Sequence, residues 1–165
     1  MNAAPPTNPE NAPVYLALGS NIAPETNLPQ AIENLNLVFG VVAQSSIWET
    51  PAEGFEGEDF LNAVVLIHTP ISADTLKTEV LRPLEALLGR VRKKEKFSPR
   101  TIDIDILLYQ DEVVDEELWT QPYLAVPLAE LYPDYSQNGT RETLKDVANN
   151  LKQNHPIKKW ESSDN

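Results

Sequence analysis

The run Phe97–Tyr109, FSPRTIDIDILLY, decides the fold around it, because its second half alternates in the manner of a β-strand over Thr101–Tyr109. Side chains two residues apart in a strand point to the same face. We expect the core face to carry Ile102, Ile104, Ile106 and Leu108. We expect the other face to carry Thr101, Asp103, Asp105, Leu107 and Tyr109. A shift of one residue would bury both aspartates, so the register is well determined.

Before this strand, the sequence predicts three strands and two helices. The apolar run Val14–Leu18 predicts a buried strand that ends in a tight turn at Gly19, Ser20 and Asn21. A helix capped by Asn27 is expected to stop at Gly40, and Val41–Glu49 is expected to be a strand. Thr50–Asp59 is expected to be a loop and Phe60–His68 a buried strand.

The second helix is expected to begin at Ser72 and to end at Gly89, with Pro83 kinking or splitting it. Its expected apolar stripe consists of Leu76, Val80, Leu84, Leu87 and Leu88. After a basic loop at Arg90–Pro99 and the Thr101–Tyr109 strand, four short elements are expected. They are a hairpin return at Glu112–Val114, helices at Leu128–Leu131 and Thr143–Leu151, and a last strand at Ile157–Trp160.

The resulting order, β-α-β-β-α-β, predicts an α+β sandwich with helices on one face of a mainly antiparallel sheet. With 165 residues, the chain is long enough for one domain and too short for two. We expect residues 1–12 to be a disordered tail, 13–161 to be the single domain, and 162–165 to be a second tail.

Composition narrows the chemistry. The chain has no cysteine and only two histidines, so a metal site would consist mainly of carboxylate oxygens, which favour Mg²⁺, Mn²⁺ or Ca²⁺. No run approaches the ~18 apolar residues of a membrane span, and the polar start is unlike a secretory signal. We expect a cytoplasmic protein. Its net charge of −12 argues against nucleic-acid and anionic-membrane partners.

Positive charge is concentrated in one segment of this acidic chain. Seven of the thirteen basic residues lie there, namely Arg82, Arg90, Arg92, Lys93, Lys94, Lys96 and Arg100. This concentration indicates either a local anion site or a solvated basic loop, and charge alone does not choose between the two.

The paired aspartates favour the anion site. Two carboxylates on one strand face repel each other unless water or a cation lies between them, and Mg²⁺ in phosphate chemistry is commonly held by such a pair. Arg90, Arg92, Lys96 and Arg100 would then surround a metal–triphosphate complex, as in phosphoryl transfer. The alternative is a solvated strand face that happens to carry two acids.

The chain resembles the 6-hydroxymethyl-7,8-dihydropterin pyrophosphokinases, folate-pathway enzymes that transfer pyrophosphate from ATP to a pterin alcohol. The matching segments are YLALGSN at Tyr15–Asn21, SIWETP at Ser46–Pro51, FLNAV at Phe60–Val64, GRVR at Gly89–Arg92, SPRTIDIDIL at Ser98–Leu107, VPLAEL at Val126–Leu131 and the closing Ile157–Trp160. The resemblance implies a ferredoxin-like α+β fold, in agreement with the element order above.

The resemblance also implies roles for individual residues. Asp103 and Asp105 would bind two Mg²⁺ ions, while Arg90, Arg92 and Arg100 would contact the triphosphate of ATP, the co-substrate. The remaining nucleotide-side positions would be Glu85, Lys96, Ile106 and Thr120. The pterin would contact Thr50, Pro51, Phe60, Asn62 and Phe97, although Pro51 and Phe60 also suit ordinary turn and core packing. A monomer is expected.

The sequence departs from the family pattern at several places. Lys96-Phe97-Ser98 stands where Arg-Trp-Gly is common, and Glu53 replaces a small apolar residue. Pro122–Ala125 runs straight into Val126, so a segment with an Arg and a pterin-stacking Phe is missing. Three outcomes stay open: weaker pterin binding, a different acceptor, or a relative that binds ATP as a sensor without turnover. An RNA-binding module of similar layout is disfavoured by the acidic strand face.

Overall fold

A computed structural model describes residues 12–52, 57–90, 101–137 and 140–161. Its seven strands form one sheet in the order β6-β5-β1-β4-β3-β7, with β2 also beside β4, and each of these pairs is antiparallel. The strands are β1 Ala12–Ser20, β2 Ala43–Gln44, β3 Trp48–Thr50, β4 Phe60–Thr69, β5 Asp103–Tyr109, β6 Glu112–Val113 and β7 Lys158–Lys159. The helices are α1 Pro24–Phe39, α2 Ala73–Thr75, η2 Leu76–Leu81, α3 Arg82–Leu87, η3 Glu116–Trp119, α4 Pro122–Leu131 and α5 Leu144–Asn154.

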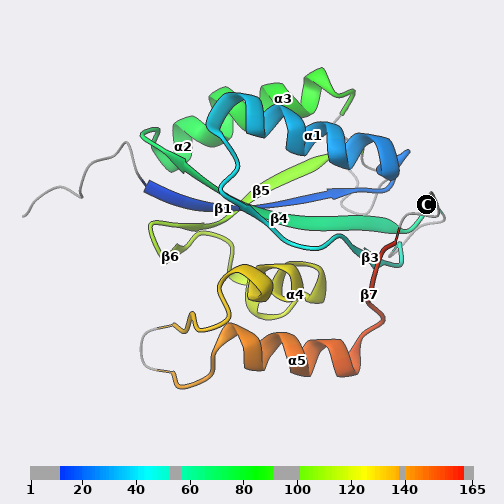
Figure 1. Ribbon diagram of the computed structural model, residues 1–165, viewed down its shortest axis with the longest axis vertical. Coiled ribbons are helices and arrows are strands. Elements are labelled where there is room, and N and C mark those ends of the chain that lie inside the picture. The colour runs from blue at the N-terminus through cyan, green and yellow to red at the C-terminus, as the bar shows by residue number, and fades with distance from the viewer. Residues whose placement is uncertain (1–11, 53–56, 91–100, 138–139, 162–165) are drawn as a thin grey trace, which may run out of the picture.

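The α+β class and the antiparallel sheet are confirmed. Helices α1 and α2–α3 cover one face, and α4 and α5 form a further layer below the other face (Figure 1). The expected one-face sandwich is therefore extended, and the central strands β1 and β4 are buried on both sides because each face has its own core. Within the described ranges, no helix is long and apolar enough to cross a membrane.

The first helix begins earlier than expected. It starts at Pro24, whose restricted φ suits the first position of a helix, and Asn27 lies inside the first turns instead of capping them. The end at Gly40 is confirmed, and this glycine has a φ of 77°, which side-chain-bearing residues rarely adopt. The expected strand Val41–Glu49 is wrong in one respect, because it is divided into β2 and β3. Between them the Ser45 hydroxyl accepts the backbone N–H of Val64, which interrupts the regular ladder.

Pro83 is accommodated by a π turn. The N–H of Arg82 donates to the carbonyl of Lys77, five residues earlier, so η2 contains one extra residue per turn just before the proline. The extra residue rotates the helix, which buries Leu81 and Glu85 and leaves Leu87 76% exposed. Within the expected stripe, only the position of Leu87 is therefore wrong: Leu76 is buried, and Val80, Leu84 and Leu88 pack against the core.

The π turn yields a direct test of stability. Leu81→Ala should lower the free energy of unfolding by about 2–5 kcal/mol, because Leu81 is fully buried in the core. Leu87→Ala should change it by less than about 0.5 kcal/mol, because that side chain is exposed. Urea denaturation measures both values, and the reverse ranking would mean that the helix is regular through Pro83.

A β-bulge in β5 changes the faces of its last residues. Leu16 pairs with Ile106 but Tyr15 pairs with Leu108, so Leu107 is the extra residue. The expected faces are confirmed for the isoleucines and for Leu107. The expected face is wrong for Leu108, which joins Leu107 in the core under α4. It is also wrong for Tyr109, which packs against the core on the opposite face and donates a hydrogen bond to the carbonyl of Ile71 at 2.6 Å.

Candidate active site

The candidate site begins with a row of paired residues at one end of the sheet. Gly19 in β1 pairs with Asn62 of β4 on one side and with Asp103 of β5 on the other. Neighbouring strands are ~4.8 Å apart, so the backbones of Asn62 and Asp103 are about 10 Å apart with only a glycine between them. A Cβ on Gly19 would lie 3.1 Å from the Asn62 side-chain oxygen. Gly19 and Ser20 belong to β1, so the expected turn begins only after them.

The free edge of β5 is satisfied by side chains. β6 pairs only with Leu108 and Tyr109, so on the edge away from β1 the backbone near Ile104 faces α3, and no strand of the described residues pairs with it there. Glu85 Oε2 accepts the N–H of Ile104 at 2.7 Å, and the Arg82 guanidinium donates to the Ile104 carbonyl at 3.2 Å. Arg90 donates to the carbonyl of Ile102 at 2.9 Å. Buried backbone groups need such partners, and here a helix supplies them.

The same two arginines contact the aspartates. Arg90 forms an ion pair with Asp103 at 2.9 Å, and Arg82 lies 3.7 Å from a carboxylate oxygen of Asp105. Arg82 also pairs with Glu85 at 2.9 Å, and Glu85 is only 1% exposed. A surface cavity of about 470 Å³ adjoins these side chains and is lined by Lys77, Arg82, Glu85, Ala86 and Arg90. The site thus combines two carboxylates with a group of basic side chains, the basic wall formed by Lys77, Arg82 and Arg90.

Arg82 was absent from the expected site. The available signal was its i, i+3 spacing from Glu85, which allows an ion pair on one helix face. Glu85 was expected near the nucleotide, and the structure gives it hydrogen bonds to β5 and to Arg82. A buried carboxylate with these partners is suited to holding the strand in place.

Arg90 and Arg82 offset only part of the negative charge of the aspartate pair. Burial, followed by the charge of Asp103, raises the pKa of Asp105 to about 7, and Arg82 opposes this rise only in part. A divalent cation between the carboxylates would relieve the repulsion. Among the described residues there is no cluster of three or more possible His, Cys, Asp or Glu ligands. A pair of carboxylates suits Mg²⁺, which keeps several waters and takes other ligands from substrate phosphates.

The raised pKa predicts how Asp105 affects stability in the absence of metal. Between its ordinary pKa of 3.8 and about 7, the folded protein binds a proton at Asp105 that the unfolded chain has lost. This proton stabilises the fold at low pH, and its contribution disappears as the pH rises toward 7. Relative to the parent, Asp105→Asn should therefore gain stability from pH 5 to pH 8, as measured by urea denaturation in chelator.

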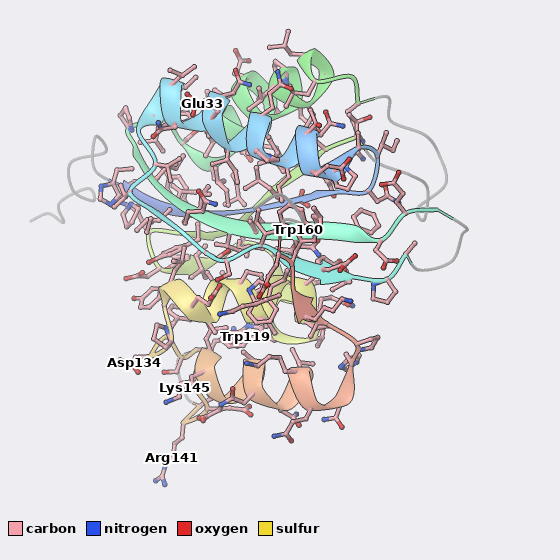
Figure 2. The ribbon with its side chains drawn as sticks, turned by 45° about the vertical axis from the view of Figure 1, so that its right-hand side comes forward. Glu33, Trp119, Asp134, Arg141, Lys145 and Trp160 are labelled. Carbon is pink, nitrogen blue, oxygen red and sulfur yellow. The ribbon has the colours of Figure 1, made fainter. Side chains whose placement is uncertain are left out.

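A matched control for this titration is Asp134→Asn. Asp134 is exposed and lies just beyond α4, away from the sheet (Figure 2). The difference in the free energy of unfolding between Asp134→Asn and the parent should stay constant across the same pH range. A flat profile for Asp105→Asn would contradict the raised pKa.

At the other end of the row, on the acceptor side where the pterin is expected, hydrogen bonds fix the orientation of the Asn62 side chain. Asn62 uses its amide nitrogen to donate to the Trp48 carbonyl at 3.2 Å and to the Thr50 hydroxyl at 3.0 Å. This orientation leaves the side-chain oxygen facing Gly19. Thr50 pairs with Phe60 across β3 and β4, so three of the expected pterin contacts lie together. Pro51 is exposed and follows directly after β3.

The other expected residues lie apart from this row or outside the described residues. Ile106 is buried in the core on the opposite face of β5 from the aspartates, and Thr120 is exposed between η3 and α4. Arg92, Lys96, Phe97 and Arg100 lie outside the described residues. Where a segment of the family pattern was expected to be missing, only Thr120 and Gln121 separate η3 from α4.

Comparison with known proteins gives consistent matches. The family model for 7,8-dihydro-6-hydroxymethylpterin-pyrophosphokinase (HPPK) matches residues 15–133. A 2-amino-4-hydroxy-6-hydroxymethyldihydropteridine pyrophosphokinase from Methylorubrum extorquens is 40% identical over 81% of this chain and 89% of its own length. The Aquifex aeolicus protein of the same name is 35% identical over 82% and 89%. The wild-type HPPK-DHPS structure from Plasmodium falciparum has a TM-score of 0.69 at 13% identity, and the match covers 87% of this chain but only 42% of that one, so it supports the fold alone.

Proposed function

Because this chain belongs to the 7,8-dihydro-6-hydroxymethylpterin-pyrophosphokinase family, we propose that the row Asn62–Gly19–Asp103 is its active centre. The activity is ATP-dependent transfer of pyrophosphate to 6-hydroxymethyl-7,8-dihydropterin in folate synthesis. The observation that carries the proposal is the pairing of Gly19 with both Asn62 and Asp103. It brings an amide suited to a heterocycle and a carboxylate suited to a metal to opposite sides of a side-chain-free position.

In the proposed reaction, a pterin bound on the Asn62 side of the row reacts with ATP bound on the Asp103 side. The hydroxymethyl oxygen attacks the β-phosphorus of ATP, the bond to the α,β-bridging oxygen breaks, and AMP leaves while the hydroxyl proton passes to solvent. Positioning both substrates contributes much of the rate in such transfers. Asn62 is suited to orienting the pterin because two hydrogen bonds hold its amide group. Thr50, Phe60, Pro51 and Phe97 complete the proposed acceptor side.

Asp103 and Asp105 would hold Mg²⁺, with two ions expected. When bound, the ions neutralise charge on the triphosphate and increase the acidity of the alcohol. Arg90 lies 2.9 Å from Asp103 and is proposed to contact the triphosphate, together with Arg92, Lys96 and Arg100. Thr120 and Ile106 remain proposed nucleotide-side positions. Glu85 and Arg82 are proposed to act by positioning β5.

We also propose that the protein is a cytoplasmic monomer that takes both substrates from solution. The net charge of −12 favours small-molecule partners over nucleic acid or an anionic membrane. A basic wall on an acidic protein is suited to attracting a polyanion such as ATP to one place.

AMP release tests the function and the metal role together. The protein is incubated with ATP, MgCl₂ and 6-hydroxymethyl-7,8-dihydropterin, and AMP is quantified by chromatography. Asp103→Asn should lower the rate by about 10²–10³-fold or more, because it removes charge that would hold Mg²⁺. Asp134→Asn should match the parent, because Asp134 is exposed and remote from the row.

Two outcomes of that assay would contradict the proposal. A parent protein that releases no AMP above background at millimolar pterin would refute this acceptor, and ATP binding without turnover would then favour the sensor. An Asp103→Asn variant with full activity would refute the metal role while leaving the acceptor in place.

A further inference from the structure

Glu130, near the end of α4, receives three hydrogen bonds from the segment that leads into β3. Its two carboxylate oxygens accept the backbone N–H and the hydroxyl of Ser46, each at 2.8 Å. The indole N–H of Trp48 donates to the same carboxylate at 3.1 Å. Hydrogen bonds to a carboxylate are stronger than those to a neutral acceptor. Three directed contacts thus link an exposed residue of α4 to Ser46 and to Trp48, the first residue of β3.

Two further contacts connect this carboxylate to the proposed acceptor side. Trp48 donates to Glu130 through its ring, and its backbone carbonyl accepts the amide of Asn62 at 3.2 Å. Thr50, two residues later in β3, accepts the same amide at 3.0 Å. The orientation of the Asn62 side chain therefore depends on the place of β3, and the place of β3 depends in part on Glu130.

Other contacts also hold β3, because its short strand pairs on both sides and Trp48 packs against Val126 and Ala148. It comprises only Trp48–Thr50 and pairs with Phe60–Asn62 of β4 and with the two-residue strand β7. The Trp48 ring is 6% exposed, and the ammonium groups of Lys152 and Lys159 lie 5.6 and 5.7 Å from its centroid. Both lysines therefore add cation–π attraction to the ring that donates to Glu130.

We propose that Glu130 is a positioning residue that sets the affinity for the pterin by orienting Asn62 through Ser46 and Trp48. This inference rests on the proposed function of Asn62. Within the described part of the chain, the hydrogen bonds of Glu130 go to Ser46 and Trp48, next to the acceptor side, and not to Asp103 or Asp105. Its loss should therefore weaken pterin binding and spare ATP binding.

The test compares Glu130→Ala, Glu130→Gln and Glu33→Ala. Glu33 is an exposed glutamate on the outer side of α1, across the sheet from α4 (Figure 2). Glu130→Ala should raise the KM for 6-hydroxymethyl-7,8-dihydropterin about 5- to 10-fold and leave the KM for ATP within about 2-fold, because the hydrogen bonds are lost on the acceptor side only. Glu130→Gln should fall between the parent and Glu130→Ala, because its single amide oxygen can still accept the Ser46 N–H and the Trp48 indole, while the Ser46 hydroxyl loses its acceptor and the negative charge is gone. Glu33→Ala should match the parent.

A purely structural role would change these values differently. A less stable protein has fewer folded molecules, so it loses apparent kcat while both KM values stay unchanged. An unchanged pterin KM in Glu130→Ala, an equal rise for ATP, or a Glu130→Gln variant as impaired as the alanine variant would each overturn the inference. If Glu130→Ala does not fold by circular dichroism, Ser46→Ala removes one donor and should raise the same KM by a smaller factor.

Calorimetry separates failure of this inference from failure of the proposed function. The pterin is titrated into the parent and into Glu130→Ala with Mg²⁺ and a non-hydrolysable ATP analogue present. Tight binding by the parent and weaker binding by the variant support the inference. Equal binding by both removes the role of Glu130 alone, whereas a parent that binds no pterin removes the proposed acceptor and the inference with it.

Discussion

The site depends on how the free edge of β5 is satisfied. An edge strand presents unpaired N–H and C=O groups, and here Arg82, Glu85 and Arg90 take the place of a neighbouring strand. The two arginines also pair with Asp105 and Asp103. Because the same side chains hold the backbone and offset part of the carboxylate charge, the geometry and the electrostatics of the site are coupled.

This arrangement requires the helix to present Glu85 to the sheet. The π turn before Pro83 supplies the required rotation, since it brings Leu81 and Glu85 to the buried side and moves Leu87 to solvent. On the other side of the row, the Asn62 amide links β4 to β3, and Glu130 links Ser46 and Trp48 to α4. Two separate sets of contacts thus hold the aspartate side and the Asn62 side, and Gly19 places no side chain between them.

The sequence alone predicted much of this arrangement. Strand alternation gave the faces of Asp103 and Asp105, and a family motif gave their expected role. Sequence reasoning missed the π turn and the bulge at Leu107, because tertiary packing outweighs local spacing there. It also missed the start of α1 at Pro24, although a proline is a local signal for the first helical position. Arg82 was counted in the basic segment, and its spacing from Glu85 indicated an ion pair, but its contacts with the Ile104 carbonyl and with Asp105 join residues distant in sequence, which no periodicity records.

The central claim is that Asp103 and Asp105 hold the metal between ATP and the pterin. The most direct measurement is anomalous diffraction from crystals grown with Mn²⁺, a non-hydrolysable ATP analogue and 6-hydroxymethyl-7,8-dihydropterin. The account predicts manganese peaks within coordination distance of both carboxylates, with the triphosphate and the pterin hydroxyl on opposite sides. Manganese bound to the triphosphate without either aspartate would contradict it.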